Sequence, residues 1–310
     1  NAEGNTYDGT TTINGGTLVE QPSLTGGTWT RATSSTTIES EGTLVLDTSA
    51  QSNAGSRQDV GTITINSGGF LELTNTASTV DRSIWSGGSI LGSGTLVKSG
   101  SGHQDIAWST SKTSLDSFSG AISIEGGYLI VNPNAGVVAG SGNFDVTVDA
   151  TLDIRTGTFK IDALDGSGTV YESDTGNTSI LWLGNNDGDG NFSGSIQNGV
   201  IVLKNGAGTQ TLSGANTTTG YLTINAGVLA LAAGGSLNTE GTVRIASGAK
   251  MDLASGIDQT VGALYLNGVQ QHTKGTYGAV GSGADNEDDT YFSGSGVLRM
   301  PAIGAIFKFK

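Results

Sequence analysis

The chain has 310 residues, of which 51 are Gly, 3 are Pro and none is Cys, and its 28 acidic and 14 basic residues give a net charge of −14. This charge argues against a nucleic acid or an anionic membrane as partner, and the lack of Cys excludes disulfides, thiolate metal sites and a Cys nucleophile. Because Gly, Thr, Ser and Asn are weak helix formers and the apolar residues keep a strict order, we predict an all-β fold.

One short pattern recurs along the chain: two alternating apolar residues, a corner that usually contains Gly, and further alternating apolar residues. Its clearest copy consists of Leu222, Ile224, the corner 225–227, Leu229 and Leu231. An isolated pair of half-buried strands is marginally stable at best, so we expect the copies to stack and share one core. In chain order, the seven copies begin at Ile13, Ile38, Ile63, Ile122, Val146, Leu222 and Val243.

The corners follow one another at intervals of roughly 22–27 residues, a period typical of solenoids, whereas a propeller blade needs roughly 40–50. The wider gaps leave room for further turns, which we assign to Leu91/Leu96/Val97, Leu164/Val170 and Ile196/Leu203. We therefore predict a parallel β-helix, or β-solenoid, of roughly 12–14 turns. Leu, Ile and Val should point inward as ladders, and Thr, Ser, Asn and Glu should point outward.

Three segments without the pattern are predicted to be loops: 48–59, 99–116 and 171–191. Solenoids usually carry such insertions on one face.

The C-terminal part leaves the pattern and is predicted to close the stack. Residues 1–260 should form the β-helix repeats, and residues 261–310 the C-terminal turn and cap, because a solenoid must cover its last open edge. The last ten residues, 301–310, fit a closing strand, a linker or a contact segment equally well. The chain begins at Asn1 with neither Met nor a leader, so we expect a processed product or a cloned fragment.

Two longer motifs accompany the turns: a Gly-Thr-Leu-x-Lys element rich in Gly, and an Ile/Val-x-x-Gly-x-Leu-x-Leu close. The first is found at 94–102 and in part at 203–208, continued by 212–216, and the second at 7–18, 118–129 and 220–231. With these motifs, most of the chain resembles the passenger-associated repeat of bacterial autotransporters, also called the autotransporter-associated β-strand repeat. The resemblance implies a right-handed parallel β-helix, secretion, and a cell-surface or extracellular location in a Gram-negative bacterium, but no activity.

Two acidic segments are the candidate metal sites. Residues 185–191 place oxygen-bearing side chains at alternate positions before Gly, as the start of a calcium loop does. The bidentate Glu of such a loop is missing, because Ile196 stands in its place, so an acidic turn explains the segment better. Residues 285–289 are likewise expected to form a solvated loop. We assign no metal and no cofactor.

Catalytic residues are not expected. General acid–base catalysis needs acids within mutual reach, and the sequence shows no aligned acids on successive turns. His103 and His272 are predicted to be single loop histidines. The Gly-rich segments 92–94 and 281–283 lack the Lys-Ser/Thr ending of a phosphate loop and are predicted to be corners.

The sequence thus predicts a non-enzymatic extracellular β-solenoid that acts as a surface stalk, an adhesin or a filament subunit. Its expected partners are a second copy, added head-to-tail through open solenoid ends, or a cell-surface or glycan ligand, with no nucleic acid and no membrane embedding. The alternative is a secreted glycan-binding or glycan-cleaving β-helix. A glycan-binding face would need exposed aromatic side chains, for which the tryptophans are candidates: Trp29, Trp85, Trp108 and Trp182.

Overall fold

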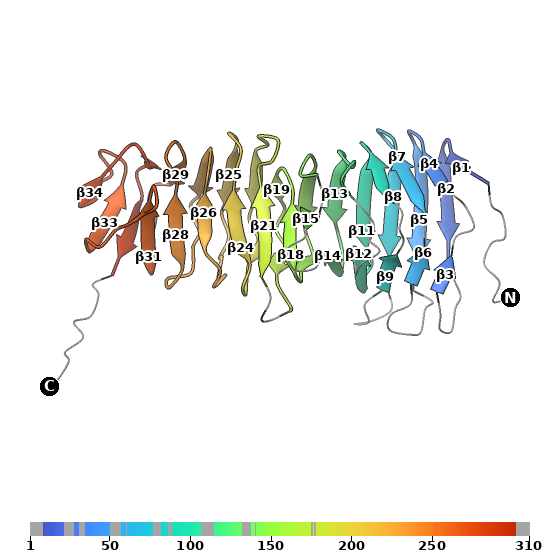
Figure 1. Cartoon of the computed structure of the whole chain (residues 1–310), viewed down its shortest axis with the longest axis horizontal. Helices are drawn as coiled ribbons and strands as arrows, with labels where there is room; N and C mark the ends of the chain where they lie inside the picture. The colour runs from blue at the N-terminus through green and yellow to red at the C-terminus, as the bar shows by residue number, and fades with distance from the viewer. Residues whose placement is uncertain are drawn as a thin grey trace.

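The computed structural model shows one elongated stack of strands, with the first strands at one end of the rod and the C-terminal strands at the other (Figure 1). It describes residues 9–21, 28–30, 35–49, 57–59, 61–76, 82–85, 89–106, 115–131, 138–139, 141–174, 176 and 178–301. These residues form strands and turns and no helix. The predicted all-β solenoid is confirmed, since nearly all strands pair in parallel with the equivalent strand of the next turn.

The first part of the rod is built from three sheets, here called A, B and C, and each early turn contributes one strand to each. Sheet A has the order β1-β4-β7-β10, with β1 Thr11–Ile13, β4 Ser35–Ile38, β7 Thr62–Ile65 and β10 Ile90–Gly92. Sheet B has the order β2-β5-β8-β11-β13-β16-β19, with β2 Gly16–Glu20, β5 Gly42–Asp47, β8 Phe70–Thr74, β11 Thr95–Ser99, β13 Ala121–Ile124, β16 Asp145–Val148 and β19 Leu164–Asp165. Sheet C has the order β3-β6-β9-β12-β14-β17-β20-β23, with β3 Thr28–Thr30, β6 Arg57–Asp59, β9 Arg82–Trp85, β12 His103–Ile106, β14 Tyr128–Val131, β17 Thr151–Ile154, β20 Thr169–Tyr171 and β23 Ser195–Ile196.

The second part of the rod is built mainly from sheets D and E, which take over from sheets A and B. Sheet D has the order β15-β18-β21-β24-β26-β28-β31-β32, with β15 Val138–Ala139, β18 Gly157–Lys160, β21 Ser179–Leu183, β24 Ile201–Lys204, β26 Leu222–Ile224, β28 Thr242–Ile245, β31 Ala263–Leu266 and β32 Val269–Gln270. Sheet E has the order β22-β25-β27-β29-β35, with β22 Gly190–Phe192, β25 Thr209–Leu212, β27 Val228–Leu231, β29 Lys250–Leu253 and β35 Phe292–Gly294.

The core is a set of apolar ladders inside the coil, as the alternation predicts. In sheet A, Ile13 pairs with Ile38, which pairs with Ile65, and all three are buried. The apolar residues of the copies that begin at Ile38, Ile63, Ile122, Val146, Leu222 and Val243 are buried as well. Leu18 in the first turn is the exception among the copies, at 38% exposed, because β2 is the outermost strand of its sheet.

Glycine is required where successive corners touch. A Cβ at Gly214 would lie 1.9 Å from the carbonyl oxygen of Gly194, and a Cβ at Gly194 would lie 2.0 Å from that of Gly168. No side chain fits between corners stacked this closely, so these glycines allow the turns to stack.

The expected number of turns, roughly 12–14, exceeds the number of strands in any one sheet. Among the described residues, the longest sheets, C and D, contain eight strands each. The expectation assumed that one corner pattern continues through the whole chain. Instead, the ladder passes from one set of sheets to another: sheet A ends at β10 and sheet B at β19, while sheet D begins at β15 and sheet E at β22. The right-handed winding stays a prediction.

The predicted loops are wrong in part, because strands lie inside them. Segment 48–59 contains β6, segment 99–116 contains β12, and segment 171–191 contains β21 and the start of β22. The sequence pattern showed two strands per turn and missed the third. Strand β12, with the sequence His-Gln-Asp-Ile, has no apolar alternation to reveal it.

The C-terminal strands combine parallel and antiparallel pairing. Strand β31 continues the ladder from β28, and β32 turns back against it in antiparallel fashion. Sheet F has the order β30-β36-β33-β34, with β30 Asp258–Thr260, β36 Val297–Met300, β33 Gly275–Gly278 and β34 Asn286–Glu287, and β33 pairs antiparallel with β36. This arrangement agrees in kind with the predicted cap, while the division into residues 1–260 and 261–310 stays a prediction. Residues 302–310 lie outside the described part.

Candidate functional site

Two lysines occupy places in the core where apolar residues were expected. Lys98 stands between Leu73 and Ile124 in the inner ladder of sheet B, and Lys204 stands between Leu183 and Ile224 in that of sheet D. Both are fully buried. The expected inward residues Leu91, Val97 and Leu203 instead point outward and are half-buried, so the prediction was one residue out of phase at these turns.

The ammonium group of each lysine binds the carbonyl oxygens of corners. Lys98 Nζ donates to the carbonyls of Ser99 (2.5 Å), Gly100 (3.0 Å) and Gly126 (2.9 Å). The last of these belongs to the corner of the next turn. Burial lowers the pKa of Lys98 to about 8, because a low-dielectric interior disfavours the charged form.

Lys204 repeats the arrangement further along the rod. Its Nζ donates to the carbonyls of Asn205 (2.5 Å), Gly206 (3.1 Å) and Ala226 (3.5 Å). Burial also lowers the pKa of Lys204, and the carboxylates of Asp187 and Asp189 oppose that shift. Each lysine therefore fixes a corner of its own turn to the corner that follows. Both lysines lie in the Gly-Thr-Leu-x-Lys element, which is complete at 94–102 and partial at 203–208. This element was the signal in the sequence that could have located the two lysines.

The acidic segment 185–191 forms a corner whose carboxylates bind backbone amides. Asp187 Oδ1 accepts the N–H of Ala207 and Asp189 Oδ1 that of Thr209, both at 2.5 Å. From the preceding turn, Asp162 Oδ1 accepts the N–H groups of Asn186 (2.7 Å) and Gly188 (2.9 Å). The aspartates thus connect three successive turns. That no metal binds here stays a prediction; within the described ranges, no group of three or more His, Asp or Glu side chains has metal-binding geometry.

The second acidic segment, 285–289, is largely exposed to solvent, but it contains strand β34 and its carboxylates bind groups of the C-terminal cap. Asp285 Oδ2 accepts the N–H and the hydroxyl of Thr276 (2.9 and 3.1 Å), and these bonds lower the pKa of Asp285. Glu287 accepts the N–H groups of Gly281 and Gly283. The Gly-rich segment 281–283 is therefore a turn held by Glu287.

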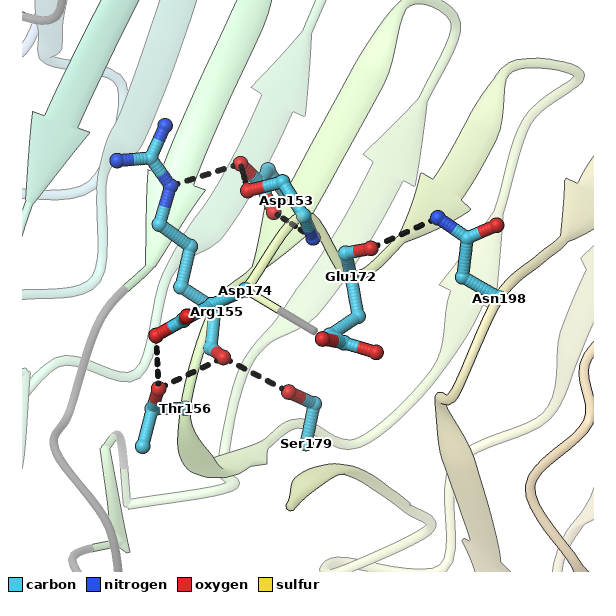
Figure 2. A network of polar contacts seen from close by, with 8 residues as sticks. Asp153, Arg155, Thr156, Glu172, Asp174, Ser179 and Asn198 are labelled. Carbon is cyan, nitrogen blue, oxygen red and sulfur yellow. Dashed lines mark hydrogen bonds and ion pairs between the residues drawn. The ribbon is translucent and has the colours of Figure 1, made fainter. Parts of the chain in front are cut away.

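One group of acids on two adjacent turns, beside β17 and β20, is a candidate catalytic constellation (Figure 2). Asp153 is buried and accepts hydrogen bonds from the N–H and hydroxyl of Ser173 and from Arg155 Nε (3.1, 2.7 and 3.0 Å). Asp174 accepts the Thr156 hydroxyl at 3.1 Å.

Glu172 is the third acid of the group and is buried. Its pKa is raised by burial and by the negative charges of Asp174 and Asp153, against a hydrogen bond from the Gly199 backbone. Its Oε1 atom is buried without a hydrogen-bond partner. Because Asp153 and Glu172 are both shielded from solvent, the group has the properties of a structural connection between turns.

The other sequence candidates are not gathered into one site. His103 is the first residue of β12 and not a loop residue; its ring lies 4.2 Å from that of Tyr128. His272 is exposed in the turn region after β32, and segment 92–94 forms the corner between β10 and β11, as predicted. Trp182 points outward from β21, where Lys160 Nζ lies 5.3 Å from its ring centre. Trp29 and Trp85 stand in β3 and β9, but their side chains, and all of Trp108, lie outside the described part.

Comparison with known proteins finds similarity to one repeat family. The family model of the passenger-associated transport repeat matches residues 1–19 and 202–231. The chain is also similar to the adhesin BmaC autotransporter of Brucella suis biovar 1 (strain 1330). The two sequences are 31% identical over 179 residues, and the aligned part makes up 56% of this chain and 5% of that protein. No solved structure matches the chain at a significant level.

These similarities bear out the predicted resemblance to autotransporter passenger repeats and point to a secreted or cell-surface protein. The chain spans only about one twentieth of the relative's length. Across the ranges that the structure describes, no helix is long and apolar enough to cross a membrane.

Proposed function

We propose that the chain is a non-enzymatic, extracellular β-solenoid that serves as a surface stalk or adhesin. The observation that carries this proposal is the continuous parallel pairing along the rod, with an interior filled by apolar ladders and by the two corner-binding lysines. Such an interior gives a stiff rod with few openings for proteases. The passenger-repeat match and the similarity to an adhesin support a role at the cell surface.

The acids near β17 and β20 support a non-enzymatic role. A glycan-cleaving β-helix needs an acid and a base that both reach the substrate. Asp153 and Glu172 are buried, and Asp153 is already bound by Ser173 and Arg155.

Among the described residues, the strands at the two ends of the stack differ, and this difference supports a single rod over head-to-tail addition of this chain. In the described part of the first turn, β1, β2 and β3 are each the last strand of their sheet, and Val19 is 57% exposed. At the other end, β32 and β33 pair antiparallel with β31 and β36. A copy added head-to-tail would need a parallel strand edge at both ends.

Three experiments test this proposal. Negative-stain microscopy of the purified chain should show discrete rods of one chain's length, and filaments would contradict the single-rod proposal. Beads coated with the folded chain should adhere to host-cell or matrix surfaces more strongly than beads coated with heat-unfolded chain. Equal adhesion of both would argue against an adhesin. Release of new reducing ends from a polysaccharide panel would overturn the non-enzymatic assignment.

A further inference from the structure

The outer face of sheet D differs from the other outer faces in its side chains. Its strands β18, β21, β24, β26, β28 and β31 are in register, so each outward residue lies directly above its equivalent in the neighbouring turn. We call this surface the aromatic–basic face. Its first row consists of Lys160, Trp182, Leu203, Thr223, Arg244 and Tyr265, and its second of Thr158, Ile180, Ile201, Tyr221, Thr242 and Ala263.

Two cations on this face are held against aromatic rings. The Arg244 guanidinium lies between two tyrosines, 4.5 Å from the ring centre of Tyr221 and 5.1 Å from that of Tyr265. Lys160 stacks on Trp182 at 5.3 Å. Such contacts attract the cation to the ring face. Among the described residues, neither Lys160 nor Arg244 forms an ion pair.

The charge of this face is opposite to that of the chain. The chain carries a net charge of −14, yet neither row of the aromatic–basic face contains Asp or Glu. Its two cations are therefore not neutralised locally, and the face is suited to an anionic ligand.

The shape of the face selects among anionic ligands. Strands are about 4.8 Å apart, so six in register extend about 24 Å along the rod, while the two rows are only about 7 Å apart. A globular protein partner usually covers roughly 800 Å² on each side, which is far more than this narrow strip offers. The strip fits one extended chain lying along the rod.

We propose that the aromatic–basic face binds a linear acidic saccharide. The rings of Trp182, Tyr221 and Tyr265 pack against the apolar faces of sugar rings, and Lys160 and Arg244 pair with the carboxylate or sulfate groups. This inference rests on the proposed surface role and deepens it by naming a ligand class.

The test is a titration of the whole chain with four probes of similar length. These are an oligogalacturonate (carboxylate), a heparin-derived oligosaccharide (sulfate), a neutral cello-oligosaccharide and inorganic polyphosphate. At least one acidic saccharide should bind at least tenfold more tightly than the neutral saccharide and the polyphosphate, and its identity distinguishes carboxylate from sulfate recognition. Equal binding of polyphosphate would show a charge effect alone and overturn the proposal, as would the absence of any acidic-saccharide binding.

Variants locate the binding on this face. Trp182→Ala, Arg244→Gln and Tyr265→Ala should each weaken binding by about tenfold. The matched controls are Phe70→Ala on the outer face of sheet B and Lys250→Gln on that of sheet E, which remove an equivalent ring or charge elsewhere and should leave affinity unchanged. Equal losses in the controls would overturn the assignment, provided that all variants keep the unfolding midpoint of the wild type. If coated beads adhere while the wild-type chain binds no acidic saccharide, this inference fails and the proposed function stands.

Discussion

The outer faces of sheets B and D lie on strands with the same alternation but carry different chemistry. On sheet D, the paired outward positions hold aromatic rings and cations. On sheet B, one outward row holds Val19, Val45, Glu72, Val97, Ser123 and Thr147. It contains neither a ring nor a cation. The inward residues of both sheets are mostly Leu, Ile or Val, with one buried Lys each, and sheet D adds the buried Phe159 and Ser179. Inward residues therefore determine the coil, while outward residues are free to determine binding.

The comparison predicts, first, that the two buried lysines are equivalent. Lys98→Met in sheet B and Lys204→Met in sheet D should each lower the free energy of unfolding by roughly 2–3 kcal/mol, because buried carbonyls lose their donor. Denaturant unfolding would measure this. Lys250→Met, a half-buried outward position, is the control and should stay within about 0.5 kcal/mol. If only one of the two buried lysines mattered, their equivalence would be refuted.

Second, the aspartates between turns should act without a metal. Asp162→Ala removes the acceptor of two backbone N–H groups and should cost about 2 kcal/mol. Asp165→Ala removes the acceptor of one, the N–H of Asn191, and should cost less. Added Ca²⁺ should leave the melting temperature of the wild type unchanged. A rise with Ca²⁺ that Asp187→Asn abolishes would show a calcium site.

Third, the stability contributed by Lys98 should rise with pH. Its pKa is lowered to about 8 in the folded chain, whereas an unfolded lysine keeps its proton up to about pH 10.4. The unfolded state therefore binds more protons above pH 7, and the free energy of unfolding should gain roughly 1 kcal/mol from this group between pH 7 and pH 9. The difference between wild type and Lys98→Met isolates this effect. A pH-independent difference would show that the folded lysine titrates as an exposed one does.

Fourth, Glu172→Gln should stabilise the chain slightly at pH 7. The folded pKa of Glu172 is raised, so its favourable contribution is present below the unfolded pKa and is lost as the pH rises through the folded pKa. The raised pKa means that the ionised form of this buried carboxylate is unfavourable in the folded chain. Gln avoids that cost, and the gain should be below about 1 kcal/mol. Asp153→Asn is the contrast: it weakens the bond to Arg155 and should destabilise. Destabilisation by Glu172→Gln would mean that the carboxylate is needed in its charged form.

The sequence predicted the inward ladders because period and alternation are properties of neighbouring residues. It misplaced the core at Lys98 and Lys204, since a lysine beside Val97 or Leu203 looks like the outward residue until the corner carbonyls are seen. It missed β12 because that strand is mostly polar. The aromatic–basic face was not predictable for another reason: Trp182, Arg244 and Tyr265 become neighbours only through the register of stacked turns.

The central claim is that inward residues determine folding and the outward residues of sheet D determine binding. The most direct test measures adhesion and unfolding free energy together for the triple variant Trp182→Ala/Arg244→Gln/Tyr265→Ala and for Lys204→Met. The triple variant should lose adhesion to acidic-saccharide surfaces and keep its stability to within about 1 kcal/mol. Lys204→Met should lose stability and, under conditions where it stays folded, keep adhesion. Undiminished adhesion of the folded triple variant would contradict the account.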